Sequence, residues 1–315
     1  MRLTLTFLAA LLAAPALAQD CPSGQRPFTH AAGTDCIPTD PQRIVALQDQ
    51  NVLLPLMELG VTLLGASGRL DADGNRVFRR LDGYDTSDVE FVGLHREEDK
   101  ELVVALEPDL IITTPSPEWH YETYTPIAPT IVIDMFNQPL QPALRQFAEA
   151  VNRVETHDAL KAEFDARAAA VRADLGDTPG QTKALVMLNN GALRALPWVQ
   201  GFGAAFEAIG FKRTDWEEEN VTGIGVVEFS REVLGNIEAD AIFVIDFSGD
   251  DGPNGQYEQV VADPLFQLHP AGQAEQIYQI DGTRMGGTSW RRTLDGVNQL
   301  AEILGAPGFR TDIAD

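Results

Sequence analysis

The sequence is poor in basic residues. Its 315 residues include 23 Lys and Arg against 47 Asp and Glu, which gives a formal net charge of −24 at pH 7. A surface of that sign repels nucleic acid and anionic lipid, so nucleic acid is not an expected partner. The charge does not exclude an anionic small ligand, because a local basic pocket can lie inside an acidic surface.

Motifs of common enzymes are also missing. No Gly-x-Ser-x-Gly nucleophile elbow occurs, and the acidic run at 249–255 lacks the spacing and terminal glutamate of a calcium loop. We therefore expect no catalytic residue and no enzyme. A secreted hydrolase is the alternative from another function class, but the sequence offers no motif for it.

Long apolar runs are absent outside the N-terminus. Residues 1–20 carry one basic residue, Arg2, then an apolar stretch at 3–14 and the small-x-small sequence Ala16-Leu17-Ala18. This pattern predicts a secretory signal peptide over residues 1–18, cut after Ala18, rather than a membrane span. A lipid anchor on Cys21 is disfavoured because Gln19 and Asp20 precede it. We expect a soluble protein exported to the periplasm.

Cysteine is limited to Cys21 and Cys36. In an oxidising compartment an even pair this close predicts a disulfide that closes the segment 19–40. Closing a loop of this length contributes roughly 3 kcal/mol in the chain-entropy model. The alternative is a metal site with His30, although two thiols and one histidine fall short of a tetrahedral site.

Strand-like and helix-like runs alternate in two separate regions. Residues 41–138 contain apolar strands at 43–47, 61–67, 109–114 and 130–134, with helical patterns at 50–60 and 100–108. Residues 177–315 repeat the theme, with strands at 183–188, 241–246 and 276–280 and helices at 203–211 and 230–240. Such alternation favours parallel βαβ units.

A helical spacer, residues 139–176, separates the two regions. Leu160, Phe164, Ala168, Val171 and Leu175 recur at helical spacing and form one apolar stripe. The predicted fold is therefore α/β, with two Rossmann-like lobes of mainly parallel sheets joined by a single long interlobe helix.

Several stretches, in this order and spacing, resemble the periplasmic iron–siderophore binding proteins. They are RIVALQDQNVLLPLMELGV, VGLHREEDKELVVALEPDLIITT, ETYTPIAPTIVI and DPLFQLHPAGQAEQIYQIDG. The resemblance covers residues 41–305. It implies a monomeric binding protein without a resident cofactor, which captures a ferric siderophore between its lobes and passes it to an inner-membrane ABC permease.

The sequence is also compatible with two other classes of ligand. Haem or a corrinoid would use the same fold, with Tyr121 or His95 available as an axial haem ligand. A bare Zn²⁺ or Mn²⁺ would require three or four converging ligands, and His95 and His120 lack a third histidine.

Arginines and aromatic side chains in strand-end loops are the expected ligand contacts. Guanidinium groups suit the oxygens of a ferric complex, and aromatic faces suit its organic frame. The candidates are Arg69, His95, Arg96, Trp119, Tyr121, Arg194, Trp198, Arg284, Trp290 and Arg291. We expect no protein ligand to the metal itself.

The resemblance also shows departures at named positions. Arg284, in the arginine-rich stretch IDGTRMGGTSWRR (280–292), stands where hydroxamate-siderophore binders carry an aromatic residue. His95 stands where the resembled proteins place an arginine after Gly-Leu, so either His95 or the following Arg96 is the expected contact. An arginine in place of an aromatic residue favours an anionic siderophore. Glu118 matches an acidic residue that pairs with the permease in the family.

Overall fold

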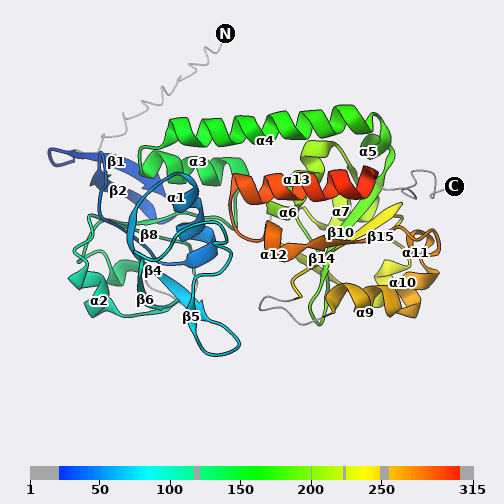
Figure 1. The fold of residues 1–315 in the computed structure, drawn as a ribbon, viewed down its shortest axis with the longest axis horizontal. Coiled ribbons are helices and arrows are strands. Elements are labelled where there is room, and N and C mark those ends of the chain that lie inside the picture. Colours follow the sequence, from blue (N-terminus) through cyan, green and yellow to red (C-terminus); the bar gives the residue numbers. More distant parts are fainter. Residues whose placement is uncertain (1–20, 117–120, 200, 223–224, 249–254, 306–315) are drawn as a thin grey trace, which may run out of the picture.

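The structure is a computed structural model that describes residues 21–116, 121–199, 201–222, 225–248 and 255–305. Figure 1 shows two α/β lobes side by side, with helix α4 (Val154–Leu175) running along both of them. Within the described residues, no helix has the length and apolar character needed to span a membrane. The predicted fold class, two mainly parallel lobes joined by one long helix, is confirmed.

The N-terminal lobe is built on a sheet with the strand order β7-β6-β4-β3-β8-β9, and β5 pairs with β4. Its strands are β3 (Ile44–Ala46), β4 (Leu63–Leu70), β5 (Arg76–Val77), β6 (Glu90–Leu94), β7 (Glu97–Glu98), β8 (Leu110–Thr113) and β9 (Thr130–Val132). The five from β6 to β9 along this order are parallel, while β5 and β7 are antiparallel edges. Every residue of β8 is buried, as in a strand covered on both faces.

Short helices connect these strands. They are η1 (Asp49–Leu53), α1 (Leu54–Glu58), α2 (Lys100–Ala105) and η2 (Tyr121–Thr123). The carboxylate of Asp99 caps α2 by accepting from the backbone N–H groups of Glu101 at 3.0 Å and Leu102 at 3.2 Å.

The C-terminal lobe has the strand order β13-β11-β10-β14-β15, with β12 pairing with β10. Its strands are β10 (Lys183–Asn189), β11 (Leu193–Ala195), β12 (Lys212–Arg213), β13 (Val227–Phe229), β14 (Ala241–Asp246) and β15 (Ile277–Asp281). Strands β12, β10, β14 and β15 are parallel, whereas β11 and β13 add an antiparallel edge that the sequence did not predict.

Nine short or medium helices cover this sheet among the described residues. They are α5 (Thr178–Gln181), α6 (Gly201–Ile209), α7 (Asp215–Asn220), α8 (Arg231–Leu234), α9 (Gln256–Ala262), α10 (Pro264–Leu268), α11 (Pro270–Gln273), α12 (Gly282–Met285) and α13 (Trp290–Gly305). The helix expected over 230–240 is only α8, because the chain leaves the helix at Gly235.

The spacer contains two helices. Helix α3 (Leu140–Ala150) comes first, and α4 is about 33 Å long at 1.5 Å per residue. The predicted stripe is buried at Leu160, Phe164, Ala168 and Val171. It packs against α13 and α6, which fixes α4 along the top of the C-terminal lobe.

The N-terminal segment is a hairpin of β1 (Gln25–His30) and β2 (Gly33–Pro38), closed by the predicted Cys21–Cys36 disulfide. His30 Nε2 donates to Asp35 Oδ2 at 2.8 Å, and His30 Nδ1 accepts from the backbone N–H of Val132 at 3.2 Å. The disulfide uses both thiols, so the alternative metal site with His30 is wrong. His30 instead holds the hairpin against β9.

Candidate ligand-binding site

A cavity of about 400 Å³ lies between the two lobes. The N-terminal lobe lines it with Gln50, Asn51, Arg80, Met135 and Phe136, and the spacer lines it with Leu140. The C-terminal lobe lines it with Leu188, Leu196, Pro197, Gly201, Phe202, Gly225, Val226, Phe247, Gly287 and Thr288. The volume falls within the range of small-molecule sites.

The cavity stands at the carboxyl ends of parallel strands. Gln50 follows β3, Met135 follows β9 and Phe247 follows β14. Ligands of open α/β sheets bind at this edge, because the loops that leave the strands meet there. The two lobes thus present their ligand-binding edges to one shared space.

Most of the cavity wall is apolar. The rings of Phe202 and Phe247 pack edge to face with centroids 5.7 Å apart. Phe136 and Val226 remain 44% and 50% exposed, which is unusual for large apolar side chains beside a cavity. Such a wall gains free energy when an organic frame covers it.

Arg80 is the charged side chain among the described residues that line this cavity. Its guanidinium lies 4.9 Å from the ring centroid of Phe247, on the other lobe, and Nη1 donates to Gln50 Oε1. Gly286 leaves room for it, because a Cβ there would collide with the guanidinium. The backbone φ of Arg80 is 62°, in the left-handed region that a bulky residue rarely adopts.

The sequence analysis missed Arg80. The signal was present, because two adjacent arginines, Arg79 and Arg80, stand in the polar loop that follows β4 and β5. The sequence analysis predicts a ligand contact in this region only at Arg69, which lies near the end of β4.

The structure brings Arg69, His95 and Arg96 together on the N-terminal lobe, outside the lining of the cavity. Burial, together with the positive charges of Arg69 and Arg96, lowers the pKa of His95 to about 4, against the opposing charge of Asp49. His95 is therefore neutral at pH 7. Arg96 is exposed, and its backbone N–H donates to Glu98 Oε1 at 3.0 Å.

The charge of Asp49 acts on His95 in this cluster. The carboxylate of Asp49 is fully buried, accepts from the backbone N–H of Arg79 at 3.2 Å and lies 3.5 Å from Arg79 Nε. The arginine next to the cavity, Arg80, follows directly in the chain. Asp49 thus supports the segment that carries Arg80.

Tyr121, the remaining described candidate of the N-terminal lobe, does not line the cavity. Tyr121 begins η2 and is partly exposed. Trp119 and Glu118 lie outside the described residues, as does His120. Among the residues that the structure describes, no group of three or more His, Cys, Asp or Glu could hold a metal ion.

Arg194 and Trp198 flank the cavity wall without facing the cavity. Arg194, on β11, donates to Asn190 Oδ1 at 2.7 Å and lies 3.4 Å from Glu228 Oε2. Trp198 is buried, and its indole N–H donates to Glu217 Oε1 at 3.3 Å. This placement makes Trp198 a core residue.

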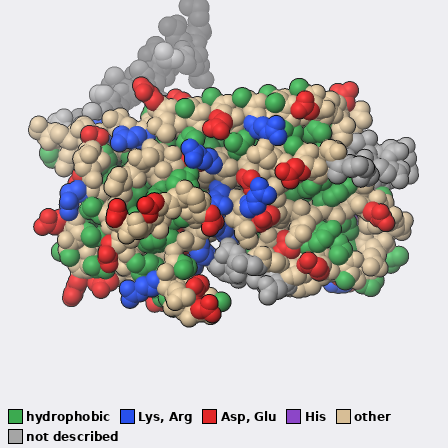
Figure 2. Space-filling model, in the orientation of Figure 1, with side chains coloured by type: hydrophobic (Ala, Val, Ile, Leu, Met, Phe, Trp, Pro, Cys, Tyr) green, Lys and Arg blue, Asp and Glu red, His purple; other side chains and the backbone are tan. Residues whose placement is uncertain are grey.

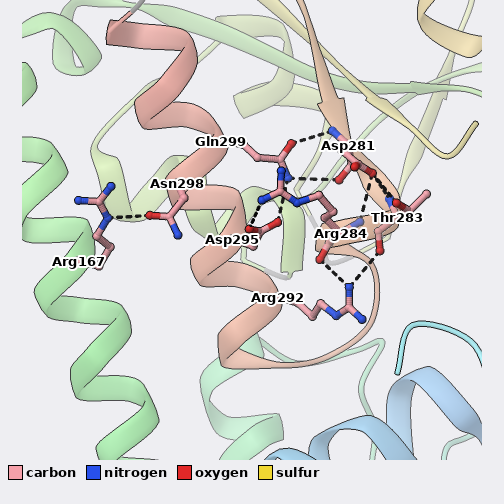
Figure 3. A network of polar contacts seen from close by, with 8 residues as sticks. All are labelled: Arg167, Asp281, Thr283, Arg284, Arg292, Asp295, Asn298 and Gln299. Carbon is pink, nitrogen blue, oxygen red and sulfur yellow. Dashed lines mark hydrogen bonds and ion pairs between the residues drawn. The ribbon is translucent and has the colours of Figure 1, made fainter. Parts of the chain in front are cut away.

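Figure 3 shows how the arginine-rich stretch is held. Arg284 Nη2 is 2.5 Å from Asp295 Oδ1 on α13, and Arg292 Nη1 donates to the carbonyls of Thr283 at 3.3 Å and Arg284 at 3.1 Å. Arg284 and Arg291 line a separate hollow of about 290 Å³, beside Tyr84. We call this space the arginine hollow.

Trp290 lies in the core rather than at the cavity. Its ring centroid is 5.2 Å from that of Phe164 and 5.9 Å from that of His157, both on α4. Gly287 and Thr288, three and two residues earlier, are the members of this stretch that line the cavity. The stretch contributes glycine backbone to the site, and its arginines hold the structure around it.

Comparisons with known proteins agree with this architecture. A family model described as periplasmic binding protein matches residues 61–283. A probable siderophore-binding lipoprotein, YfiY of Bacillus subtilis, is 27% identical over 84% of this chain and 84% of its own length. The achromobactin-binding periplasmic protein of Dickeya dadantii is 24% identical over 100% of this chain and 93% of its own length.

Solved structures show the same fold. The Staphylococcus aureus protein SirA, solved in complex with staphyloferrin B, superposes with a TM-score of 0.74 at 22% identity, covering 90% of this chain and 99% of SirA. The family match spans both lobes and the interlobe helix. The chain therefore belongs to the periplasmic binding protein family.

Proposed function

We propose that this protein captures a ferric siderophore in the interlobe cavity and delivers it to an ABC importer of the inner membrane. The observation that carries the proposal is the cavity itself, which joins an apolar wall from both lobes to the single guanidinium of Arg80. The siderophore-binding and achromobactin-binding relatives, and the structural neighbour solved with staphyloferrin B, support the ligand class.

The side chains of the cavity wall indicate which class of siderophore fits the cavity. A guanidinium offers paired donors to a carboxylate, catecholate or hydroxamate oxygen, while Phe202 and Phe247 offer apolar surface to an organic frame. We therefore propose an anionic ferric complex that places an oxygen group at Arg80. The cavity is less basic than the sequence predicted, because Arg69, Arg194, Arg284 and Arg291 do not line it.

Export and delivery belong to the same proposal. The predicted signal peptide and the extracytoplasmic relatives support a location outside the cytoplasm. We propose a periplasmic monomer that presents the loaded cavity to a permease, with binding rather than catalysis as its task. Haem, a corrinoid and bare divalent metals remain the ligands against which this must be tested.

Isothermal titration calorimetry tests the proposal. The mature protein is titrated with ferric complexes of citrate, a hydroxamate and a catecholate, and with haemin, cobalamin, Zn²⁺ and Mn²⁺. We expect saturable binding of at least one ferric complex. Saturable binding of haemin, cobalamin or a bare metal alone would contradict the proposal.

A further inference from the structure

A loop of the C-terminal lobe reaches across to the N-terminal lobe beside the cavity. Residues 286–289, which connect α12 to α13, form this interlobe loop. The backbone N–H of Thr288 donates to the carbonyl of Gln50 at 3.1 Å, and Thr288 Oγ1 bonds Asn51 Oδ1 at 3.0 Å. A Cβ on Gly287 would lie 2.6 Å from Leu54 Cδ2 and 3.0 Å from the Gln50 carbonyl, so only glycine allows this approach.

Glu58, the last residue of α1, holds the end of this loop. Its carboxylate accepts from Ser289 Oγ at 2.6 Å and from the backbone N–H groups of Trp290 at 3.0 Å and Arg291 at 2.8 Å. Glu58 itself is 6% exposed. The first N–H groups of a helix have no partner within the helix and normally bond a side chain of the same local segment. At the start of α13, Ser289 Oγ accepts from the backbone N–H of Arg292 at 3.2 Å in this usual way. A carboxylate from the other lobe accepts from the two preceding N–H groups.

The position suits a carboxylate. The N-terminus of a helix carries partial positive charge, which stabilises an anion there. Burial raises the pKa of Glu58, and the bonds from Ser289, Trp290 and Arg291 oppose that rise by stabilising the carboxylate. Replacing this carboxylate would leave buried donors without a partner, which is unfavourable.

A second set of bonds runs in parallel. Arg292, on α13, donates through Nη2 to the carbonyl of Arg80 and lies 3.4 Å from Asp82 Oδ2. Arg80 in turn lies over Phe247 of the C-terminal lobe. The residues that tie the lobes together are thus direct neighbours of the residues that line the cavity.

The arginine hollow lies beside this junction. It is lined by Arg284, Arg291 and Arg292 and by two carboxylates, Asp82 and Asp295. Arg284 is paired with Asp295 and Arg292 with Asp82, while the charge of Arg291 acts on Glu58. Figure 2 shows Lys and Arg side chains gathered near the middle of this face, with Asp and Glu among them. These arginines thus serve contacts at the junction of the lobes.

We propose that Glu58 is a positioning residue, which fixes the separation of the two cavity walls by capping α13 from the opposite lobe. Helix α4 joins the lobes along one edge, where a single connection would still permit twisting (Figure 1). The interlobe loop adds a second connection at the cavity. The two walls then meet the ligand as one preformed unit, which lowers the ordering cost of binding.

The distance between the lobes tests this directly. Spin labels on Glu101→Cys and Glu258→Cys, exposed positions on α2 and α9, report the interlobe distance by pulsed electron resonance. We expect a narrow distribution for the parent protein and a broader or shifted one after Glu58→Gln. An unchanged distribution would overturn the proposal.

Asp240→Asn is the matched control. Asp240 is a carboxylate buried to a similar degree, and it accepts from the backbone N–H of Lys183 at 2.7 Å. Asp240 and Lys183 both belong to the C-terminal lobe, at the amino ends of β14 and β10 and away from the cavity. We expect it to lower the melting temperature without changing the interlobe distance. If Asp240→Asn broadened the distribution as much as Glu58→Gln, the effect would be general destabilisation and the proposal would be wrong.

Ligand affinity gives a second readout, and this part rests on the proposed function. Glu58→Gln should weaken binding of the ferric complex roughly tenfold while Asp240→Asn leaves it unchanged. If no ferric complex binds the parent protein, the proposed function fails, and the distance measurement still decides the role of Glu58. Should Glu58→Gln not fold, Ser289→Ala removes one of the three bonds and should broaden the distribution less. No broadening in a folded Ser289→Ala would also count against the proposal.

Discussion

At the scale of single residues, the placement of each arginine decides its role. Arg80 lines the cavity and lies over Phe247, whereas Arg284 is paired with Asp295 and Arg292 bonds three backbone carbonyls. The sequence could rank arginines by their position after strands. It could not show which of them already had a partner, because that depends on how helix α12, helix α13 and the segment with Arg80 pack together.

Arg80→Gln should weaken binding of an anionic ferric siderophore at least tenfold, or about 1.4 kcal/mol, because it removes the charge from the cavity wall. Arg284→Gln is the matched variant, since Arg284 belongs to the same stretch as the cavity-lining Gly287 but is paired with Asp295. Calorimetry of both variants separates the two roles. A loss of affinity in Arg284→Gln alone would reverse this assignment.

His95 predicts a loss of stability in acid. Its pKa is about 4 in the folded protein, mainly because of burial, and about 6.5 when unfolded. Between these values the unfolded chain binds more protons, so the free energy of unfolding falls as the pH drops from about 6.5 toward 4, by about 1–3 kcal/mol.

Urea unfolding of the parent protein and His95→Gln at several pH values between 7 and 4.5 measures this contribution. The variant lacks the titrating group, so its stability should fall less over the same range. Parallel pH profiles for the two proteins would show that His95 is not the group responsible.

At the scale of elements, the buried strands and the stripe of α4 followed from hydrophobic periodicity. Leu160 and Phe164 face the core as expected, because the apolar stripe of α4 packs against α13 and α6. The antiparallel edge formed by β11 and β13 was not predicted. Both strands are three residues long, too short to show a periodic pattern.

The disulfide-closed hairpin is predicted to add stability without contributing to binding. Replacing Cys21 and Cys36 by serine should lower the free energy of unfolding by up to about 3 kcal/mol, since the bond closes a loop with a sequence separation of 15. Siderophore affinity should stay unchanged, because no hairpin residue lines the cavity in the described part of the chain. A loss of siderophore affinity along with the loss of stability would show that the hairpin contributes to binding.

At the scale of the whole molecule, helix α4 and the interlobe loop both join the lobes. The helix α4 was predicted from the sequence, but the capping of α13 by Glu58 was not, because the two residues that bond are separated by more than 200 positions. The family resemblance indicated a shared cleft. The residues that line the cleft could be identified only from the structure, since the wall combines short segments from both lobes.

Ligand binding should therefore change the overall shape very little. Small-angle scattering of the free and loaded protein should give radii of gyration that agree within about 1 Å, as in other preorganised complexes. A clear contraction on loading would indicate hinge closure and contradict a preformed cavity.

The position of bound iron tests the central claim most directly. In crystals of the protein with an anionic ferric siderophore, anomalous scattering at the iron edge locates the metal without assumptions about the ligand. We expect one strong anomalous peak between the lobes, with the siderophore against Phe202 and Phe247 and an oxygen group at Arg80. A peak elsewhere on the protein, or none at saturating ligand, would contradict it.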